Sequence, residues 1–288
     1  MPSPELVFRF DTAASPLGRA ELARLIRDEF DIDVTPLDRT GHDPSIVGFG
    51  WWAGNELVAN VSLHRRTLWL TGKPVEAFGL QSVAVRPPWR GRGLFRDLMA
   101  RALAHADARV GLVTLTTETP ALYTPFGFRA VAESSFAGPL APDGTGPNHR
   151  RLSLDLDADL ALLRDLFARR APVSHLCAAI DHPALFVLKA ITSPEVSLLH
   201  LPDLDAIVAV EVGEPGELTL LDVVAPEIPP FAAIAAALAS PAGRGRVFVT
   251  PDRLTWSPTE TEDQDSGLMV RGRFAAEGLA IALSPMQV

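Results

Sequence analysis

The stretch VAVRPPWRGRGLFRDLM, residues 83–99, joins a short apolar run to an amphipathic segment through two prolines and two glycines. Proline has no backbone N–H to donate to a strand ladder, so a strand that includes Val85 must stop by Pro87. From Gly93 to Asp107, apolar side chains recur at helical spacing and predict a helix. The join itself, Arg90 to Gly93, fits either a tight turn with its arginines in solvent or a site for an anion.

Physical chemistry favours the anion site at this join. The first N–H groups of a helix lack acceptors, and the helix dipole adds partial positive charge there. Glycine lets the backbone approach a ligand closely, and arginine adds a planar set of donors, so together they make a cradle for phosphate or pyrophosphate. The stretch is not a dinucleotide fingerprint, because Arg96 stands where the third glycine would be. Nor is it a Walker loop, because the sequence Gly-Lys-Ser/Thr is absent from it.

The composition limits the class of protein. The chain has 288 residues, 47% of them hydrophobic and 21% charged, enough for one large domain or two of ordinary size. Neither an apolar run near the roughly 20 residues of a membrane span nor a signal peptide is recognisable. Cys177 is the only cysteine, so no internal disulfide can form and a cytoplasmic protein is expected. The net charge of −9 disfavours a general nucleic-acid binder and makes the arginine cluster at the join a local exception.

A proline- and glycine-rich stretch, PLAPDGTGP at residues 139–147, interrupts the alternation of apolar strands and helices. It predicts a boundary between an N-terminal domain, residues 1–143, and a C-terminal domain, residues 148–288. The halves resemble each other, because LQSVAVRPP at residues 80–88 and LLDVVAPEIPP at residues 220–230 each precede a helix. We therefore expect two copies of one α/β unit, the second without the arginine and glycine turn.

Residues 82–99 resemble motif A of the GNAT acetyltransferase superfamily, in which Arg/Gln-x-x-Gly-x-Gly/Ala follows a strand ending in Val-x-Pro. Arg90 and Gly93 match, and Phe95 replaces the final Gly/Ala. The resemblance implies an α/β (α+β layered) fold with a mixed, largely antiparallel central sheet flanked by helices. It also implies that the loop N–H groups hold the pyrophosphate of acetyl-CoA and that the preceding strand lies along the pantetheine arm. The residues thereby assigned to this site are Val83, Ala84, Val85, Arg90, Gly91, Arg92, Gly93, Leu94 and Phe95.

Residues 115–131, LTTETPALYTPFGFRAV, resemble motif B of the same superfamily, in which Tyr-x-x-x-Gly-Phe follows an alanine on a short helix. Tyr123, Gly127 and Phe128 match this pattern. In the family this tyrosine protonates the departing thiolate of CoA, and a phenol of pKa about 10 carries the required proton at neutral pH. The alternative is that Tyr123 is an amphipathic core residue. The segment also resembles acetyltransferases of the enhanced-intracellular-survival type, which carry two GNAT-like units.

A general base is harder to find in the sequence. It is needed because an amine of pKa about 10 is neutral in only about one molecule per thousand at pH 7. Residues 79–82, on the strand before motif A, contain no carboxylate. Glu118 follows the strand that leads to Tyr123 and is the best-placed candidate. Glu76 and His64 are weaker candidates, and a chain of water molecules would serve instead.

No metal site is expected. His175 and Cys177 lack partner ligands nearby in the sequence. Residues 155–159 begin like a calcium loop, but Leu160 stands where such a loop requires glycine. The stretch TETEDQDSG, residues 259–267, is interpreted as a solvated acidic loop.

The sequence thus predicts an N-acetyltransferase, an acyltransferase that transfers groups other than aminoacyl groups, with two GNAT-like units. A primary amine on a small molecule or peptide would attack acetyl-CoA directly in the N-terminal unit, with Tyr123 and Glu118 as catalytic residues. The C-terminal unit would be degenerate and would shape the substrate site. A non-catalytic acyl-CoA sensor or interaction module is the alternative, and an α/β protein that binds another phosphate is a third interpretation. Neither nucleic acid nor a membrane is expected as a partner, and the protein would be a monomer or a homodimer.

Overall fold

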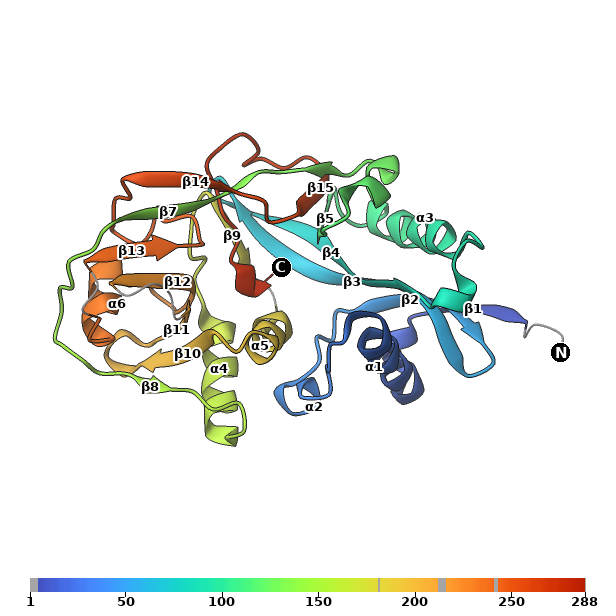
Figure 1. The fold of residues 1–288 in the computed structure, drawn as a ribbon, viewed down its shortest axis with the longest axis horizontal. Helices are drawn as coiled ribbons and strands as arrows, with labels where there is room; N and C mark the ends of the chain where they lie inside the picture. The colour runs from blue at the N-terminus through green and yellow to red at the C-terminus, as the bar shows by residue number, and fades with distance from the viewer. Residues whose placement is uncertain (1–4, 181, 212–215, 241–242, 288) are drawn as a thin grey trace.

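The computed structural model describes residues 5–180, 182–211, 216–240 and 243–287, which form two sheets with helices packed against them (Figure 1). Within these residues the first sheet has the strand order β1 (Leu6–Phe10), β2 (Val47–Ala53), β3 (Glu56–Leu70), β4 (Lys73–Val85), β5 (Leu112–Thr116), β15 (Leu268–Gly272) and β6 (Arg129–Ala130), and β9 (Cys177–Ile180) also pairs with β3. The second sheet has the order β14 (Glu260–Gln264), β7 (Glu133–Pro139), β13 (Arg244–Val247), β12 (Glu217–Val224), β11 (Ala206–Glu211), β10 (Val196–Leu201) and β8 (Arg150–Arg151).

Both sheets are mixed and largely antiparallel, which confirms the predicted fold class. Among the described strands, each sheet contains one parallel pair, β4 with β5 and β12 with β13. In the first sheet the connection between the two is α3 (Leu94–Asp107), and in the second it is α6 (Phe231–Ala237). The strand–helix–strand unit predicted from the similarity of the two halves is therefore present in each sheet.

The two sheets do not follow the expected division between residues 1–143 and 148–288. β7 precedes the proline- and glycine-rich stretch but lies in the second sheet, between β14 and β13. β15 comes from the end of the chain and lies in the first sheet, between β5 and β6. Each half thus contributes a strand to the sheet of the other half, which can be followed in Figure 1 by the green β7 on the left and the red β15 on the right.

Helices on opposite faces of the first sheet enclose two separate cores. α3 places Leu94, Leu98 and Met99 against the side chains of β3 and β4. α1 (Pro16–Phe30) places Leu22 and Leu25 against the other face, on Trp52, Leu57 and Ala84. α1 starts at Pro16 because Ser15 caps it by accepting a hydrogen bond from the Gly18 N–H, and Pro16 suits the first position of a helix.

The remaining helices are α2 (Leu37–Thr40), α4 (Asp157–Arg169) and α5 (Pro183–Thr192). α4 and α5 pack on the second sheet through Leu163, Leu166 and Phe186. β2 and β3 form an antiparallel hairpin that turns at residues 54 and 55. The interpretation of residues 259–267 as a solvated loop is wrong, because residues 260–264 form β14, whose acidic side chains pair with Arg244 and Arg246. In the described part of the chain no helix is both long and apolar enough to cross a membrane.

Candidate functional site

A cleft opens in the first sheet where β4 and β5 separate. The two strands pair at only two positions, Phe78 with Val113 and Gly79 with Thr114. β4 then continues to Val85 and β5 to Thr116 without pairing with each other, so the facing edge of β4 is left free over residues 80–85. The opening is a cleft of about 1520 Å³.

The structure brings most of the predicted site residues together at this cleft. Of the residues predicted for the acetyl-CoA site or for catalysis, those that line it are Val83, Ala84, Val85, Arg90, Gly91, Gly93, Leu94, Phe95, Glu118 and Tyr123. Arg92 does not line the cleft, and its guanidinium instead lies 4.7 Å from the centre of the Trp89 ring. Residues that are 40 positions apart in the sequence thus face one opening, because α3 and β5 return the chain to the end of β4.

The loop before α3 presents a row of free donors to the cleft. The backbone N–H groups of residues 91–96 have no acceptor among the described residues. Gly91 and Gly93 have φ angles of 75° and 80°, a region that favours glycine, and a Cβ on either would meet open space. Gly93 caps α3 without a side-chain hydrogen bond, so the start of the helix remains available to an anion.

The arginines of the opening stretch, and Arg101 just after it, have different partners. Arg86 is held by Asp28 and by the Leu57 carbonyl, and Arg101 by Asp97, so both are structural. Arg90 fastens the loop, because its Nε donates to the Val85 carbonyl at 2.9 Å and its Nη2 to Glu29 at 2.6 Å. Arg92 and Arg96 have no acidic partner in the described chain, and both are exposed beside the free N–H groups.

The one carboxylate in the first turn of α3 is directed away from this loop. Asp97 accepts hydrogen bonds from Trp51 Nε1 at 2.9 Å and from Arg101 Nε at 2.8 Å. Its charge is therefore neutralised on the β2 side of the helix. The start of α3 keeps its positive character toward the cleft, in agreement with the interpretation of the stretch as an anion site.

A β-bulge shapes the free edge of β4. Asn60 pairs with Ala84 and Ser62 with Gln81, so β4 has one more residue than β3 across this interval. Ser82 takes up the difference with a φ of 51°, which is unusual for a residue other than glycine. Asn60 is fully buried, and its Nδ2 donates to the Ser82 carbonyl at 2.8 Å. Neither Asn60 nor Ser82 is among the residues predicted for the site, because no local pattern in the sequence marks them.

Tyr123 lies at the wall of the cleft, close to the start of α3. Its ring packs edge-on against Phe95 and Phe128, with centroids 6.0 and 6.2 Å away, and the residue is 8% exposed. No described residue forms a hydrogen bond with its hydroxyl. Burial raises the pKa of Tyr123 above the ordinary value of a phenol, so the hydroxyl stays protonated at neutral pH. Tyr123 thus combines the buried, packed ring of a core residue with the protonated hydroxyl that a proton donor needs.

Three carboxylates line the cleft, and only one of them was predicted. Glu118 follows β5 and is exposed. Glu29, near the end of α1, is buried and paired with Arg90. Asp265 is exposed and comes from the turn between β14 and β15, where the Gly267 carbonyl accepts a hydrogen bond from the Thr117 N–H at 3.0 Å. Glu29 and Asp265 lie far from the motifs in sequence, so only the tertiary fold shows them.

The two weaker candidates for the base do not line the cleft. Glu76 is exposed near the start of β4 and accepts a hydrogen bond from Thr67. His64 is buried on β3, and its ring lies directly against the backbone of Gly79. Burial, and then the nearby charge of Arg66, lower the pKa of His64 to about 3. The ring is therefore uncharged at neutral pH, but its place inside the sheet keeps it out of the cleft.

The corresponding place in the second sheet is closed. β12 and β13 pair at four successive positions, from Glu217 with Arg244 to Leu220 with Val247. The first N–H of α6, that of Phe231, donates to the Leu254 carbonyl at 2.8 Å, and the Phe231 ring packs on Trp256. Pro230 precedes it and has no N–H. This helix start therefore lacks the glycines of α3 and its row of free donors, because the N–H groups of Phe231, Ala233 and Ile234 all have backbone acceptors.

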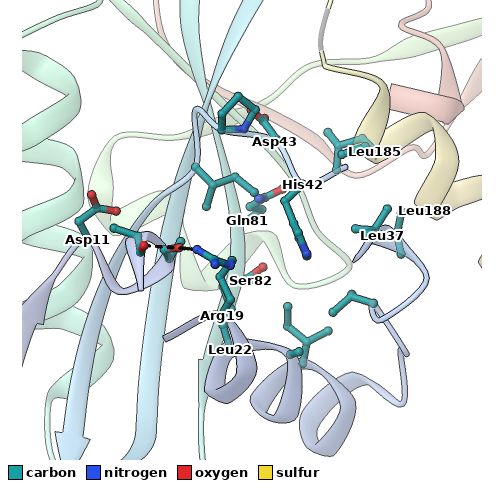
Figure 2. Close-up of a pocket in the computed structure, with 18 residues that line it drawn as sticks. Asp11, Arg19, Leu22, Leu37, His42, Asp43, Gln81, Ser82, Leu185 and Leu188 are labelled. Carbon is teal, nitrogen blue, oxygen red and sulfur yellow. Dashed lines mark hydrogen bonds between the residues drawn. The ribbon is translucent and has the colours of Figure 1, made fainter. Parts of the chain in front are cut away.

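A second cavity of about 480 Å³ adjoins the cleft on the other side of the bulge. Gln81 and Ser82 line both cavities, so the bulge is their shared wall. The remaining walls come from α1, α2, α5 and the segments at residues 11–14 and 42–46. Figure 2 shows Leu37, Leu185 and Leu188 at the right of the pocket, with Gln81 and Ser82 toward its middle. α5 belongs to the C-terminal half, which thus forms part of this pocket. Among the described residues no group of three or more histidine, cysteine or acidic side chains is placed to hold a metal ion.

Comparisons with known proteins agree with this geometry. Residues 33–131 match the model of an acetyltransferase (GNAT) domain. Solved structures of similar fold include a probable N-acyltransferase of Enterococcus faecalis, which is 14% identical in sequence. The match covers 93% of this chain and 72% of that protein, with a TM-score of 0.62. Eis1 of Mycobacterium abscessus is 17% identical, the match covers 93% of this chain and 74% of Eis1, and the TM-score is 0.59. A GCN5-related N-acetyltransferase of Kribbella flavida is 19% identical, the match covers 94% of this chain and 71% of the other, and the TM-score is 0.54.

At such identities these structures show a shared fold and no more. No curated protein matches the chain in sequence. The family model covers β2 to β6 without β15, and therefore includes the free edge of β4, the glycine loop and Tyr123. Residues 33–131 thus match an acetyltransferase (GNAT) domain, and the chain as a whole shares its fold with the solved acetyltransferase structures named above.

Proposed function

We propose that this protein transfers an acetyl group from acetyl-CoA to a primary amine by direct attack, without a covalent enzyme intermediate. The observation that carries the proposal is the cleft between β4 and β5, which has free N–H donors at one end and the Tyr123 hydroxyl close by. The match of residues 33–131 to a GNAT domain supports an acyl-CoA-dependent N-acyltransferase in general. Within this class of enzymes, we propose the acetyl group as the group transferred and a primary amine as its acceptor.

The residues around the loop fit a CoA pyrophosphate. The N–H groups of residues 91–96 would donate to its oxygens, and Arg92 and Arg96 would add charge at the rim. Arg90 would act by holding the loop against Val85 and Glu29. The free edge of Val83, Ala84 and Val85 would hydrogen-bond the pantetheine amides as a neighbouring strand does. Leu94 and Phe95 would place the first turn of α3 beside the phosphates.

The amine would reach the thioester from the pocket beyond Gln81 and Ser82. Tyr123 would donate its proton to the departing sulfur, because its raised pKa keeps the hydroxyl protonated at neutral pH. Glu118, an exposed carboxylate just after β5, would accept the proton of the ammonium group, directly or through water. As the nitrogen–carbon bond forms and the carbon–sulfur bond breaks, the nitrogen would lose its second proton, which would return to the Tyr123 phenolate directly or through water. The products are the acetamide and free CoA.

Acetyl transfer to a panel of amines tests this function. The purified protein should release CoA thiol only when both acetyl-CoA and an amine are present, and mass spectrometry should find the acetylated amine. A non-catalytic sensor would bind CoA but would release thiol from acetyl-CoA no faster than spontaneous hydrolysis does. Binding of adenosine nucleotides in preference to CoA would contradict both and support a site for another phosphate.

A further inference from the structure

The pocket beyond Gln81 and Ser82 has a composition of its own, independent of the cleft. Twelve of its eighteen lining residues are apolar. Those with the largest apolar side chains include Leu22, Ile26, Leu37, Ile46, Leu185 and Leu188, contributed by α1, α2, the segment before β2, and α5. A volume of about 480 Å³ falls in the usual range for small-molecule sites, roughly 300–1000 Å³. These walls are suited to an apolar body and offer few partners to hydroxyl groups.

The polar groups of the pocket are few, and the basic ones are already engaged. Arg19 donates to the carbonyls of Ala13 and Ala14, a contact visible as the dashed line in Figure 2. His42 Nε2 lies 2.7 Å from an Asp38 carboxylate oxygen. Neither is a free cation available to an anionic ligand.

The carboxylates are less engaged. Asp43 is 8% exposed, and one of its oxygens accepts a hydrogen bond from the Ser45 N–H at 2.8 Å. Its other oxygen accepts no hydrogen bond from a described residue, and the nearby titratable group is His182, whose pKa burial lowers although Asp43 acts against this shift. Asp11 also lines the pocket, and its side chain makes no hydrogen bond in the described chain. A nearly buried carboxylate with a free oxygen favours a cationic ligand and disfavours a second carboxylate.

We propose that the acceptor is an amine with a compact apolar body and no carboxylate, such as an arylalkyl or branched alkyl amine, bound in this pocket. The proposal rests on the proposed function, because it assigns the chemical class of the acceptor for the same reaction. The ammonium group enters the field of Asp43 and Asp11, and the apolar body packs on α5 and α1. The amine nitrogen lies at the end of the pocket beside Gln81 and Ser82, which line both cavities, and passes by these two residues to reach the thioester in the cleft. Free amino acids bring a carboxylate to an acidic pocket, and polyhydroxylated polyamines bring groups that these walls cannot satisfy.

Matched substrates test the class of acceptor. Phenethylamine should react with a kcat/KM at least tenfold higher than that of phenylalanine, and phenylalaninamide, which lacks the carboxylate, should recover most of the difference. The same order should hold for isopentylamine and leucine. A preference for phenylalanine, or for spermidine or an aminoglycoside over both apolar amines, overturns the proposal.

Variants of the wall test the place of binding. Leu188→Asn should raise the KM for phenethylamine at least tenfold and leave the KM for acetyl-CoA unchanged. Ile191→Asn introduces the same side chain on α5 outside the pocket and should have neither effect. Asp43→Asn keeps an oxygen for the Ser45 N–H and removes the charge, so it should also raise the KM for the amine. Equal behaviour of the two α5 variants overturns the proposal.

Calorimetry separates this proposal from the proposed function. Titration of phenethylamine into the protein without acetyl-CoA should show binding that Leu188→Asn weakens. If the amine binds in this way but no amine is acetylated, the proposed function fails and the pocket assignment stands. If other amines are acetylated but the apolar amines neither bind nor react, this proposal fails and the proposed function stands.

Discussion

Asn60 on β3 holds Ser82 on β4 in a left-handed conformation, with its Nδ2 donating to the Ser82 carbonyl at 2.8 Å. The contact joins a fully buried side chain of β3 to the strand that borders the cleft. It therefore fixes the wall that the cleft and the apolar pocket share. Asn60 acts through Ser82 and is a positioning residue.

Replacing Asn60 by Ala should leave CoA binding within about twofold of the wild type and lower kcat by about tenfold to a hundredfold. The reason is that a small displacement of the wall misplaces the amine relative to the thioester, whereas the pyrophosphate loop lies elsewhere. Ser62→Ala is the matched control, because it removes only the other acceptor of the Asn60 amide. Steady-state kinetics of both variants would check the prediction, and equal losses in the two would contradict it.

Replacing Tyr123 by Phe should lower kcat by about a hundredfold and leave the Kd for CoA nearly unchanged, because the hydroxyl matters most as charge develops on sulfur. Since the folded protein raises the pKa of Tyr123, activity of the wild type should persist at neutral pH and fall only as the pH rises through that raised value. If the hydroxyl were a structural group, the variant would instead lose stability and keep its turnover per folded molecule. Measurement of kcat, Kd and Tm on one preparation distinguishes these results.

Replacing Gly93 by Asp should abolish CoA binding, because it places a side chain with a negative charge at the start of α3, where the phosphates would lie. Gly54→Asp is a matched control, since Gly54 also has a positive φ, 64°, and open space around it, but lies in the β2–β3 hairpin. Both variants should lose similar stability. Calorimetry should show one CoA per chain in the wild type and in Gly54→Asp, because the start of α6 is closed. Two CoA per chain would disprove the closure of the second unit.

His64 should make the protein less stable in mild acid. Its pKa is about 3 in the folded state and about 6.5 when unfolded, so the unfolded state binds the extra proton first as pH falls. The stabilisation is present above the unfolded pKa and is lost progressively below it. The free energy of unfolding should drop by about 2 kcal/mol from this group between pH 7 and pH 5. Denaturant unfolding at both pH values should show a smaller drop for His64→Gln, and an identical drop would contradict the prediction.

Removal of residues 148–288 should leave an insoluble fragment without CoA binding. The first sheet loses β15, which lies between β5 and β6, and β9, which covers part of β3. β7 in turn loses both of its partners, β13 and β14. Solubility and a thermal melting curve of the fragment would check this, and a soluble fragment with full activity would show that the second half is dispensable.

The glycine loop and Tyr123 could be predicted because their signals are local. Proline ends the strand, glycine permits the positive φ angles, and the two motifs lie one helix and one strand apart. The bulge could not be predicted, because a serine adopts a φ of 51° only when Asn60 on another strand holds it. The exchange of β7 and β15 was missed for a related reason. The sequence LMVRG, residues 268–272, is too short to indicate which sheet it joins. Its position depends on the edges of β5 and β6, with which it pairs in the folded protein.

The exchange of strands also has a consequence for the order of events during synthesis. β5 emerges from the ribosome about 150 residues before β15, so its open edge must wait for a partner from near the end of the chain. Contacts of such long range form slowly, and an unpaired strand edge is a place where chains associate wrongly. We therefore expect the nascent chain to depend on chaperones until β15 has been made. A truncated product of translation would then carry the glycine loop but not a finished sheet behind it.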